Sequence, residues 1–171
     1  MNNKVLLGMS GGVDSSVSAI ILKEKGYEVI GASLELLNNS DNANTFGDVK
    51  NLCDELNIDY YVFDYVNEFK KNVIDNFITC YANCKTPNPC IECNKHMKFG
   101  AMWEKAIELG CQHIATGHYA KIEYSKEYKR WVLKKSKNIS KDQSYVLWSV
   151  PKEILEHIIF PLADFFSTPL L

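Results

Sequence analysis

A run of glycines, serines and one aspartate, MSGGVDSS at residues 9–16, contains the first side chains that could do chemistry. Glycines let a backbone turn tightly and approach an anion, while serine hydroxyls and the N–H groups of a helix N-terminus donate hydrogen bonds to phosphate. Asp14 would repel a phosphate, so we expect it to cap the following helix or to hold the Mg²⁺ that accompanies a nucleotide. The alternative without chemistry is a glycine turn before an ordinary helix cap.

Four of the six cysteines lie close together in the sequence and form a second candidate site: Cys80, Cys84, Cys90 and Cys93. Thiolates at such spacings suit zinc or an iron–sulfur cluster. Alternatively, the last two form a redox or sulfur-relay pair, or only Cys93 is reactive. We expect a helix to begin near Asn94, so that its dipole and Lys95 lower the pKa of Cys93. We interpret Cys53 and Cys111 as core residues.

The elements that must position these side chains alternate along the chain. Hydrophobic patterns predict strands at residues 4–9, 28–36, 59–64 and 113–116, and helices at 14–25, 49–56, 67–81 and 94–109. Such alternation is typical of an α/β fold with a doubly wound parallel sheet. Ligands bind at the carboxyl ends of the strands in such sheets, and the 9–16 run follows the first strand directly.

Other segments fall outside this alternation. Pro87 and Pro89 predict a rigid loop over residues 83–93. Residues 122–124 and 131–133 predict a small hairpin appendage, and residues 151–159 predict a final helix. We expect one domain over residues 1–150, with residues 151–171 beginning a following segment.

Composition limits the class of protein. The chain has 171 residues, 46% of them hydrophobic, which is enough for one sizeable core. Because the sequence has neither a long apolar run nor a secretory leader, we expect a cytoplasmic protein without a membrane partner. The net charge is −2, but residues 121–141 contain eight Lys or Arg and two Glu, a local charge of +6. This stretch could follow the phosphates of a nucleic acid, although a solvated face is the simpler interpretation.

The sequence motifs resemble those of a broad class of enzymes and, more specifically, those of one family within it. The string SGGVDSS lacks the pattern of a Walker loop and resembles the pyrophosphate loop (PP-loop) of N-type ATP pyrophosphatases, which have an adenine nucleotide alpha hydrolase-like fold. Five further motifs resemble those of the bacterial tRNA-specific 2-thiouridylases: TPNPCIECNK at 86–95, KFG at 98–100, ATGHYA at 115–120, KDQSY at 141–145 and FPL at 160–162. The resemblance extends from Val5 to about Leu162.

This resemblance implies sulfuration of uridine 34 in tRNA. ATP with Mg²⁺ would adenylate O2 of the uracil, and a cysteine persulfide, charged by a sulfur donor protein, would deliver sulfur to C2. By position, it assigns ATP binding to Gly8, Met9, Ser10, Gly11, Gly12, Val13, Asp14, Ser15, Leu34 and Gly117. It assigns the target base to Asn88, Pro89 and Cys90, the catalytic thiol to Cys93, and tRNA contacts to Lys141, Asp142 and Gln143. His118 would either face the nucleotide or have a structural role.

The sequence also departs from this family. Its members are about twice as long, and their persulfide-carrying cysteine lies beyond the last residue of this chain, so we expect either a separate chain that supplies the second half or incomplete thiolation. Cys84 and Lys85 stand where the family usually has Gly and Arg. The alternatives are an ATP pyrophosphatase with a different acceptor and a cysteine-bound metal, and a non-catalytic fragment that binds ATP or tRNA.

Overall fold

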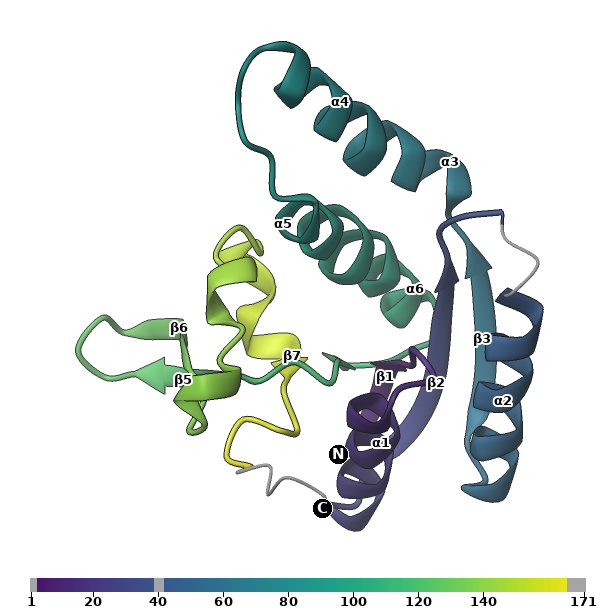
Figure 1. Cartoon of the computed structure of the whole chain (residues 1–171). Coiled ribbons are helices and arrows are strands. Elements are labelled where there is room, and N and C mark those ends of the chain that lie inside the picture. Colours follow the sequence, from purple (N-terminus) through teal and green to yellow (C-terminus); the bar gives the residue numbers. More distant parts are fainter. Residues whose placement is uncertain (1–2, 39–41, 166–171) are drawn as a thin grey trace.

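The sheet of this protein is parallel and has five strands in the order β3-β2-β1-β4-β7 (Figure 1). The structure is a computed structural model that describes residues 3–38 and 42–165. The strands of the sheet are β1 (Lys4–Gly8), β2 (Glu28–Glu35), β3 (Asp59–Asp64), β4 (His113–Ala115) and β7 (Ile158–Ile159). This architecture confirms the predicted doubly wound α/β fold.

Both faces of the sheet are buried, as the apolar run of β1 requires. Alternate residues of a strand point to opposite faces, and Val5 and Leu7 belong to one core while Leu6 belongs to the other. The first core includes residues of α1 (Val13–Glu24) and α2 (Asn42–Glu55). The second includes residues of the long helix that leads into α6 (Met102–Glu108).

The order of the strands reverses beside β1. From β1 the chain crosses to β2 and then β3 on one side, whereas β4 pairs with the other side of β1. The loops that leave β1 and β4 therefore diverge at the carboxyl edge of the sheet, which opens a crevice there. The sequence motifs at 9–16 and 115–120 follow these two strands.

The loop predicted over residues 83–93 ends earlier than expected. α5 (Pro89–Cys93) continues without a break into the π-helical η2 (Asn94–Ala101) and then α6. Proline suits the first position of a helix, and the Asn88 side chain caps this helix by accepting a hydrogen bond from the Cys90 N–H at 3.1 Å. The prediction of a helix that begins near Asn94 is therefore wrong.

A second long helix confirms the prediction for residues 67–81. It consists of α3 (Val66–Phe69), the π-helical η1 (Lys70–Ile74) and α4 (Asp75–Ala82), and Figure 1 shows it reaching away from the sheet. The predicted hairpin is also confirmed: β5 (Ala120–Ser125) pairs antiparallel with β6 (Arg130–Lys135). Cys53 and Cys111 are buried core residues, as expected.

The final helix predicted at residues 151–159 is wrong. The chain forms the short 3-10 helices η3 (Ile139–Lys141), η4 (Ser144–Val146) and η5 (Lys152–His157), and then β7 pairs parallel with β4. Two β-branched isoleucines favour the extended conformation, and β4 offers them a free edge. Residues beyond 150 thus complete the main sheet. No helix in the described ranges is both long and apolar enough to cross a membrane.

Candidate functional site

A cavity of about 400 Å³ lies at the carboxyl edge of the sheet, where the loops after β1 and β4 diverge. Polar groups from the 9–16 run and from the β4 loop line one part of it, and apolar side chains after β2 line another. Seven of the ten predicted ATP-binding residues line this cavity: Gly8, Met9, Ser10, Asp14, Ser15, Leu34 and Gly117. The other three, Gly11, Gly12 and Val13, lie in the same loop and at the start of α1.

The glycine-serine loop leaves the N-terminus of α1 without a side-chain cap. Gly12 occupies the N-cap position, so the first N–H groups of the helix receive no hydrogen bond from a capping side chain. Gly11 has a φ of +77°, a conformation that glycine adopts without strain. The Ser15 hydroxyl closes the loop by donating to the Gly12 carbonyl at 2.9 Å. Free N–H groups at the positive end of the helix dipole are suited to an anion.

Gly117 brings the β4 loop against this helix N-terminus. A Cβ atom at Gly117 would lie 3.0 Å from the backbone carbon of Asp14 and 3.2 Å from the Ser15 nitrogen. Both neighbours are backbone atoms, which cannot move aside as the end of a flexible side chain can. The close approach of the two loops therefore requires glycine here.

Asp14 does not cap α1, so one of the two predicted roles is wrong. Its Oδ1 accepts a hydrogen bond from the Tyr119 hydroxyl at 2.8 Å. It is the one carboxylate among the described residues that line the cavity. Burial and the bond to Asp14 raise the pKa of Tyr119 to about 12, so the phenol stays protonated and donates.

The KDQ segment holds Tyr119 in place. The Gln143 side chain accepts a hydrogen bond from the Tyr119 N–H at 2.9 Å, and the Gln143 N–H donates to the Tyr119 carbonyl at 2.8 Å. Lys141 Nζ lies 5.0 Å from the centroid of the Tyr119 ring. Asp142 accepts from the Ser136 N–H at 2.7 Å and from the Ser144 hydroxyl at 2.6 Å. Two of the three predicted tRNA-contact residues, Asp142 and Gln143, thus already make hydrogen bonds within the protein.

His118 lines the cavity and is almost completely buried. Its Nδ1 lies 2.8 Å from the Thr116 hydroxyl. Burial, assisted by the positive charge of Lys98, lowers the pKa of His118 to about 3, so the ring is neutral at physiological pH. The neutral ring can therefore form a hydrogen bond with a ligand without adding charge to the cavity. Lys98 supplies the positive charge on this side of the cavity.

The motifs did not reveal the apolar part of the cavity. Four apolar lining residues belong to none of the motifs: Ala32 in β2, Leu36 just after it, Phe46 in α2 and Met102 at the start of α6. Leu34 is the one member of this wall that the resemblance assigned. The sequence signal for the rest is weak, because ordinary core and loop residues line the wall and only the packing of α2 and α6 brings them together.

Cys93 does not have the environment predicted for it. The thiol lies one turn inside the helix that begins at Pro89 and is half-buried, and burial raises its pKa above the ordinary value for cysteine. Lys98 lowers this pKa to a smaller extent, and nearby Cys90 raises it. The predicted lowering by the helix dipole and Lys95 is therefore wrong.

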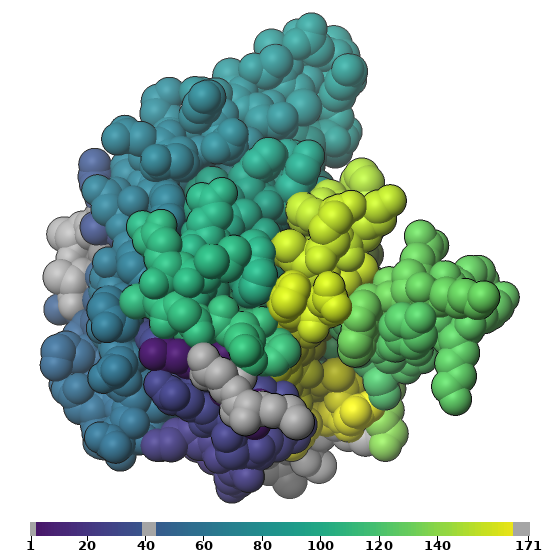
Figure 2. Space-filling model, turned by 180° about the vertical axis from the view of Figure 1, so that it is seen from behind, coloured from purple at the N-terminus to yellow at the C-terminus, as the bar shows by residue number. Residues whose placement is uncertain are grey.

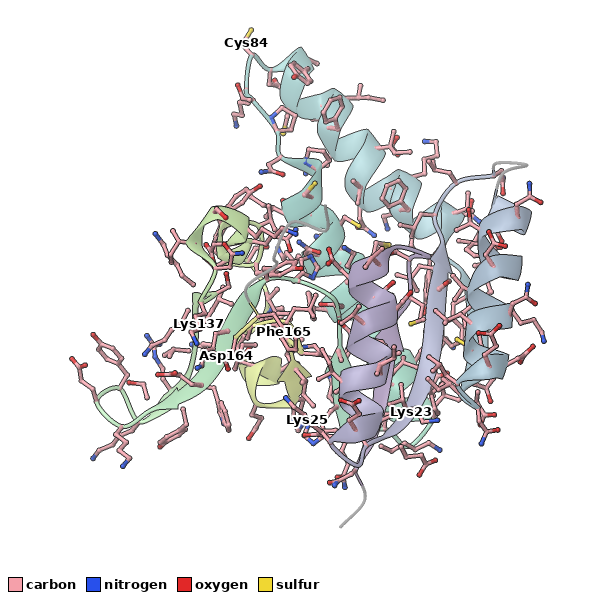
Figure 3. All side chains as sticks on the ribbon, turned by 60° about the horizontal axis from the view of Figure 1, so that its bottom comes forward. Lys23, Lys25, Cys84, Lys137, Asp164 and Phe165 are labelled. Atoms are coloured by element: carbon pink, nitrogen blue, oxygen red, sulfur yellow. The ribbon has the colours of Figure 1, made fainter. Side chains whose placement is uncertain are left out.

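The structure does not gather the four clustered cysteines into a metal site. Cys84 is exposed at the far end of the loop between the two long helices (Figure 3), and the Cys80 thiol lies 3.5 Å from the Asn76 side chain. Within residues 3–38 and 42–165, no three His, Cys, Asp or Glu side chains are grouped as metal ligands. These thiols do not fit a zinc ion or an iron–sulfur cluster.

Comparisons with known proteins agree with this geometry. The chain is 45% identical over 174 residues to the tRNA-specific 2-thiouridylase MnmA of Clostridioides difficile (strain 630), with 96% of this chain and 48% of that protein covered. It is 46% identical over 171 residues to the tRNA-specific 2-thiouridylase MnmA 1 of Syntrophus aciditrophicus (strain SB), with 96% of this chain and 45% of that protein covered. The chain thus spans about half the length of the curated relatives it matches.

Two solved structures share the fold. The U34-tRNA thiolase NcsA from Methanococcus maripaludis, solved with its [4Fe-4S] cluster, has a TM-score of 0.50 and 27% identity over 68% of this chain and 38% of that one. A predicted subunit of tRNA methyltransferase from Methanocaldococcus jannaschii has a TM-score of 0.50 and 16% identity, with 95% of this chain and 69% of that chain covered. At this level of identity the similarity shows the fold alone. The model of the family described as "tRNA methyl transferase HUP domain" matches residues 3–169, and this chain belongs to that family.

Proposed function

We propose that this chain carries out the ATP-dependent step of tRNA 2-thiouridine synthesis. The observation that supports this best is the cavity at the carboxyl edge of the sheet, where an uncapped helix N-terminus and a single carboxylate face an apolar wall. Phosphates suit the helix N-terminus, and an adenine ring suits the apolar wall. The names of the relatives, tRNA-specific 2-thiouridylases, support a uridine of tRNA as the acceptor, and we propose the cytoplasm as the compartment.

In the proposed reaction, O2 of the target uracil bonds to the α-phosphorus of ATP, and pyrophosphate leaves. The α1 N-terminus and Lys98 hold the phosphates and offset the negative charge that develops on them. Asp14, fixed by the Tyr119 hydroxyl, is the residue that would hold the Mg²⁺ bound to ATP. His118 stays neutral beside the nucleotide.

The second step exchanges AMP for sulfur. The terminal sulfur of a cysteine persulfide bonds to C2 of the uracil as the bond from C2 to the AMP oxygen breaks. The Cys93 thiolate then attacks the inner sulfur, which leaves the thiocarbonyl on the base and a disulfide between the two cysteines. We propose that the persulfide comes from a cysteine outside this chain, charged by a sulfur donor protein.

The target base would enter beside the start of the long helix. Asn88, Pro89 and Cys90 form this start, and Asn88 is already rigid because it caps the helix. A base inside a tRNA loop reaches such a site only after it has left its stack. A rigid cap gives the displaced base a fixed wall, which supports the role that the resemblance assigned to these three residues.

Exchange of labelled pyrophosphate into ATP tests the adenylation step. The purified chain should catalyse exchange only with unmodified tRNA present, because the adenylated base is the intermediate that returns to ATP. The exchange rate of the Asp14→Asn variant should be roughly 100-fold lower than that of the wild type, because a preorganised charge at the reacting phosphate is removed. Asp54→Asn is the matched control, because Asp54 is an exposed residue of α2 that pairs with Lys50.

The outcomes separate the alternatives. Exchange that depends on both tRNA and Asp14 supports the proposal. Exchange without tRNA would indicate a pyrophosphatase with another acceptor, and no exchange from a folded chain that binds ATP would indicate a binding module. Either result contradicts the proposed activity for this chain alone.

A further inference from the structure

A second concave surface lies away from the nucleotide cavity, along the free edge of β6. It is a groove of about 500 Å³ between β6 and the segment 147–155, and we call it the hairpin groove. Its lining includes three aromatic and three basic side chains: Tyr128, Trp131, Trp148, Arg130, Lys134 and Lys152. Figure 2 shows the hairpin projecting from the body of the molecule beside the C-terminal segment.

The aromatic side chains of the hairpin groove are unusually exposed. Trp148 is 70% exposed, Tyr128 61% and Trp131 38%. Two of the three tryptophans of the chain thus present ring surface to solvent on one side of the molecule. Clustered exposed aromatics mark interaction surfaces, because large apolar side chains are otherwise buried.

Three basic side chains, Arg130, Lys134 and Lys152, line the groove with these rings, together with the acidic Glu127. Lys134 pairs with Glu123 and Lys121 with Asp164, but Lys126, Lys129 and Arg130 make no ion pair within the described part of the chain. The guanidinium of Arg130 lies 5.8 Å from the centroid of the Tyr128 ring. Residues 121–141 carry a net charge of +6 in a chain whose total is −2. The positive charge is therefore concentrated around the hairpin.

The hairpin groove is connected to the nucleotide cavity through the chain itself. β5 begins at Ala120, two residues after His118 in the cavity wall. A six-residue strand spans roughly 20 Å. One strand of a DNA duplex places a phosphate about every 3.4 Å of helix axis, so a distance of this size corresponds to a few nucleotides beside a base held at the cavity.

We propose that the hairpin groove binds the tRNA substrate next to its target nucleotide, with phosphates on the basic residues and an unstacked base on Trp148 or Trp131. This inference rests on the proposed function, since it assumes that tRNA is the substrate. Grooves that combine cations with exposed aromatic rings are typical of single-stranded nucleic acid binding. The cores of protein interfaces are instead depleted in lysine, which makes a protein the less suitable occupant.

Binding of an unmodified tRNA transcript to the full 171-residue chain tests the proposal, with tryptophan fluorescence and a salt titration as the readouts. Binding should quench tryptophan fluorescence. Trp148→Ala should raise Kd about tenfold with an unchanged salt dependence, because stacking is lost but no phosphate contact is. Lys129→Gln with Arg130→Gln should reduce the slope of log K against log salt by about 1.5, since two phosphate contacts are lost.

Lys25→Gln is the matched charge control, because Lys25 is an exposed residue at the end of α1, apart from the hairpin (Figure 3). It should leave Kd and the salt slope near the wild-type values. The exchange rate at saturating tRNA should also be the same for Lys25→Gln as for the wild type. If tRNA binding depends on Trp148 but no exchange occurs, the proposed function fails and the surface assignment stands.

Two results would overturn the proposal. One is that the Trp148 and Lys129/Arg130 variants bind tRNA as tightly, and with the same salt slope, as the wild type. The other is concentration-dependent self-association of the wild type that Trp148→Ala abolishes without any change in tRNA binding, which would assign the groove to a second copy of the chain.

Discussion

At the scale of single residues, the contact between Asp14 and Tyr119 links two motifs that are 105 residues apart. Asp14 belongs to the loop after β1 and Tyr119 to the loop after β4, and Gln143 in turn fixes the backbone of Tyr119. A ligand contact at Gln143 is therefore one hydrogen-bonded residue away from the Asp14 carboxylate, and Lys141 lies over the same Tyr119 ring. If tRNA binds as proposed, this chain of contacts links its binding to the loop after β1.

The Tyr119→Phe variant tests this contact. Without the hydroxyl, Asp14 loses its fixed orientation, and a hydrogen bond to a charged group contributes about 1.5–3 kcal/mol. We expect tRNA-dependent pyrophosphate exchange to fall about tenfold and to require more Mg²⁺. Tyr61→Phe, on a surface position of β3, is the control. An unchanged rate and Mg²⁺ dependence would show that Tyr119 does not position Asp14.

The reactivity of Cys93 should depend on pH in the way that its burial dictates. Its pKa is raised, so the thiol is protonated at neutral pH and the thiolate appears only as the pH rises above the ordinary range for cysteine. Mass spectrometry should find that alkylation of Cys93 by iodoacetamide is slow at pH 7 and still accelerating above pH 9. Lys98→Met should slow it further, because Lys98 lowers this pKa. Rapid alkylation at pH 7 would contradict the assignment.

At the scale of elements, the site depends on two helix N-termini and one close loop contact. The α1 N-terminus is left open by Gly12, whereas the helix that begins at Pro89 is closed by the Asn88 side chain. The open end can therefore receive a ligand, while the closed end is rigid. The β4 loop joins the open end through Gly117, which has no side chain to keep the backbones apart.

Replacing Gly117 tests the loop contact. Gly117→Ala should push the β4 loop off the start of α1, because the new Cβ meets backbone atoms of Asp14 and Ser15 at 3.0–3.2 Å. We expect the stabilisation of the protein by ATP, measured as the shift in Tm, to be largely lost. Gly47→Ala is the matched control: nothing lies within 4 Å of its Cβ, and it lies within α2, where alanine favours the helix by up to about 1 kcal/mol. An undiminished Tm shift in Gly117→Ala would contradict the role of this contact.

At the scale of the whole molecule, residues beyond 135 join the parts of the fold. The buried Asn94 side chain donates to the Val146 carbonyl at 3.1 Å, and β7 pairs with β4. Leu147 and Leu155 belong to the same core as Leu6 of β1. The segment 136–165 therefore adds an edge strand to the sheet and core side chains beside it, and we expect it to unfold together with the sheet.

Buried His118 should make the stability of the whole molecule depend on pH. Its pKa is about 3 in the folded protein and about 6.5 when unfolded, so only the unfolded chain binds this proton between those values. The free energy of unfolding should fall as the pH drops from about 6.5 towards 3, by up to roughly 1.4 kcal/mol per pH unit from this residue. Urea unfolding of His118→Gln should show a smaller decrease over the same range. Parallel pH profiles for the two proteins would contradict this origin.

The sequence by itself determined most of the local elements and the position of the candidate site. Apolar runs of the right length predicted four strands, and SGGVDSS predicted an anion site after the first of them, because strand patterns and glycine turns depend on neighbouring residues. Local signals were weaker at boundaries. Pro89 favours a loop in the sequence although proline also begins helices, and the two isoleucines of β7 are too short a run to predict a strand.

Only the tertiary structure decided which side chains share the site and in which protonation state. Asp14, Tyr119 and Gln143 meet because β1 and β4 are adjacent in the sheet, although they are distant in sequence. No three of the described cysteines at 80–93 are grouped as metal ligands, although Cys90 and Cys93 share a helix, and the pKa of Cys93 rises because packing removes water from the thiol. Contacts between distant segments and burial are properties of the packed chain, so spacing along the sequence could not reveal them.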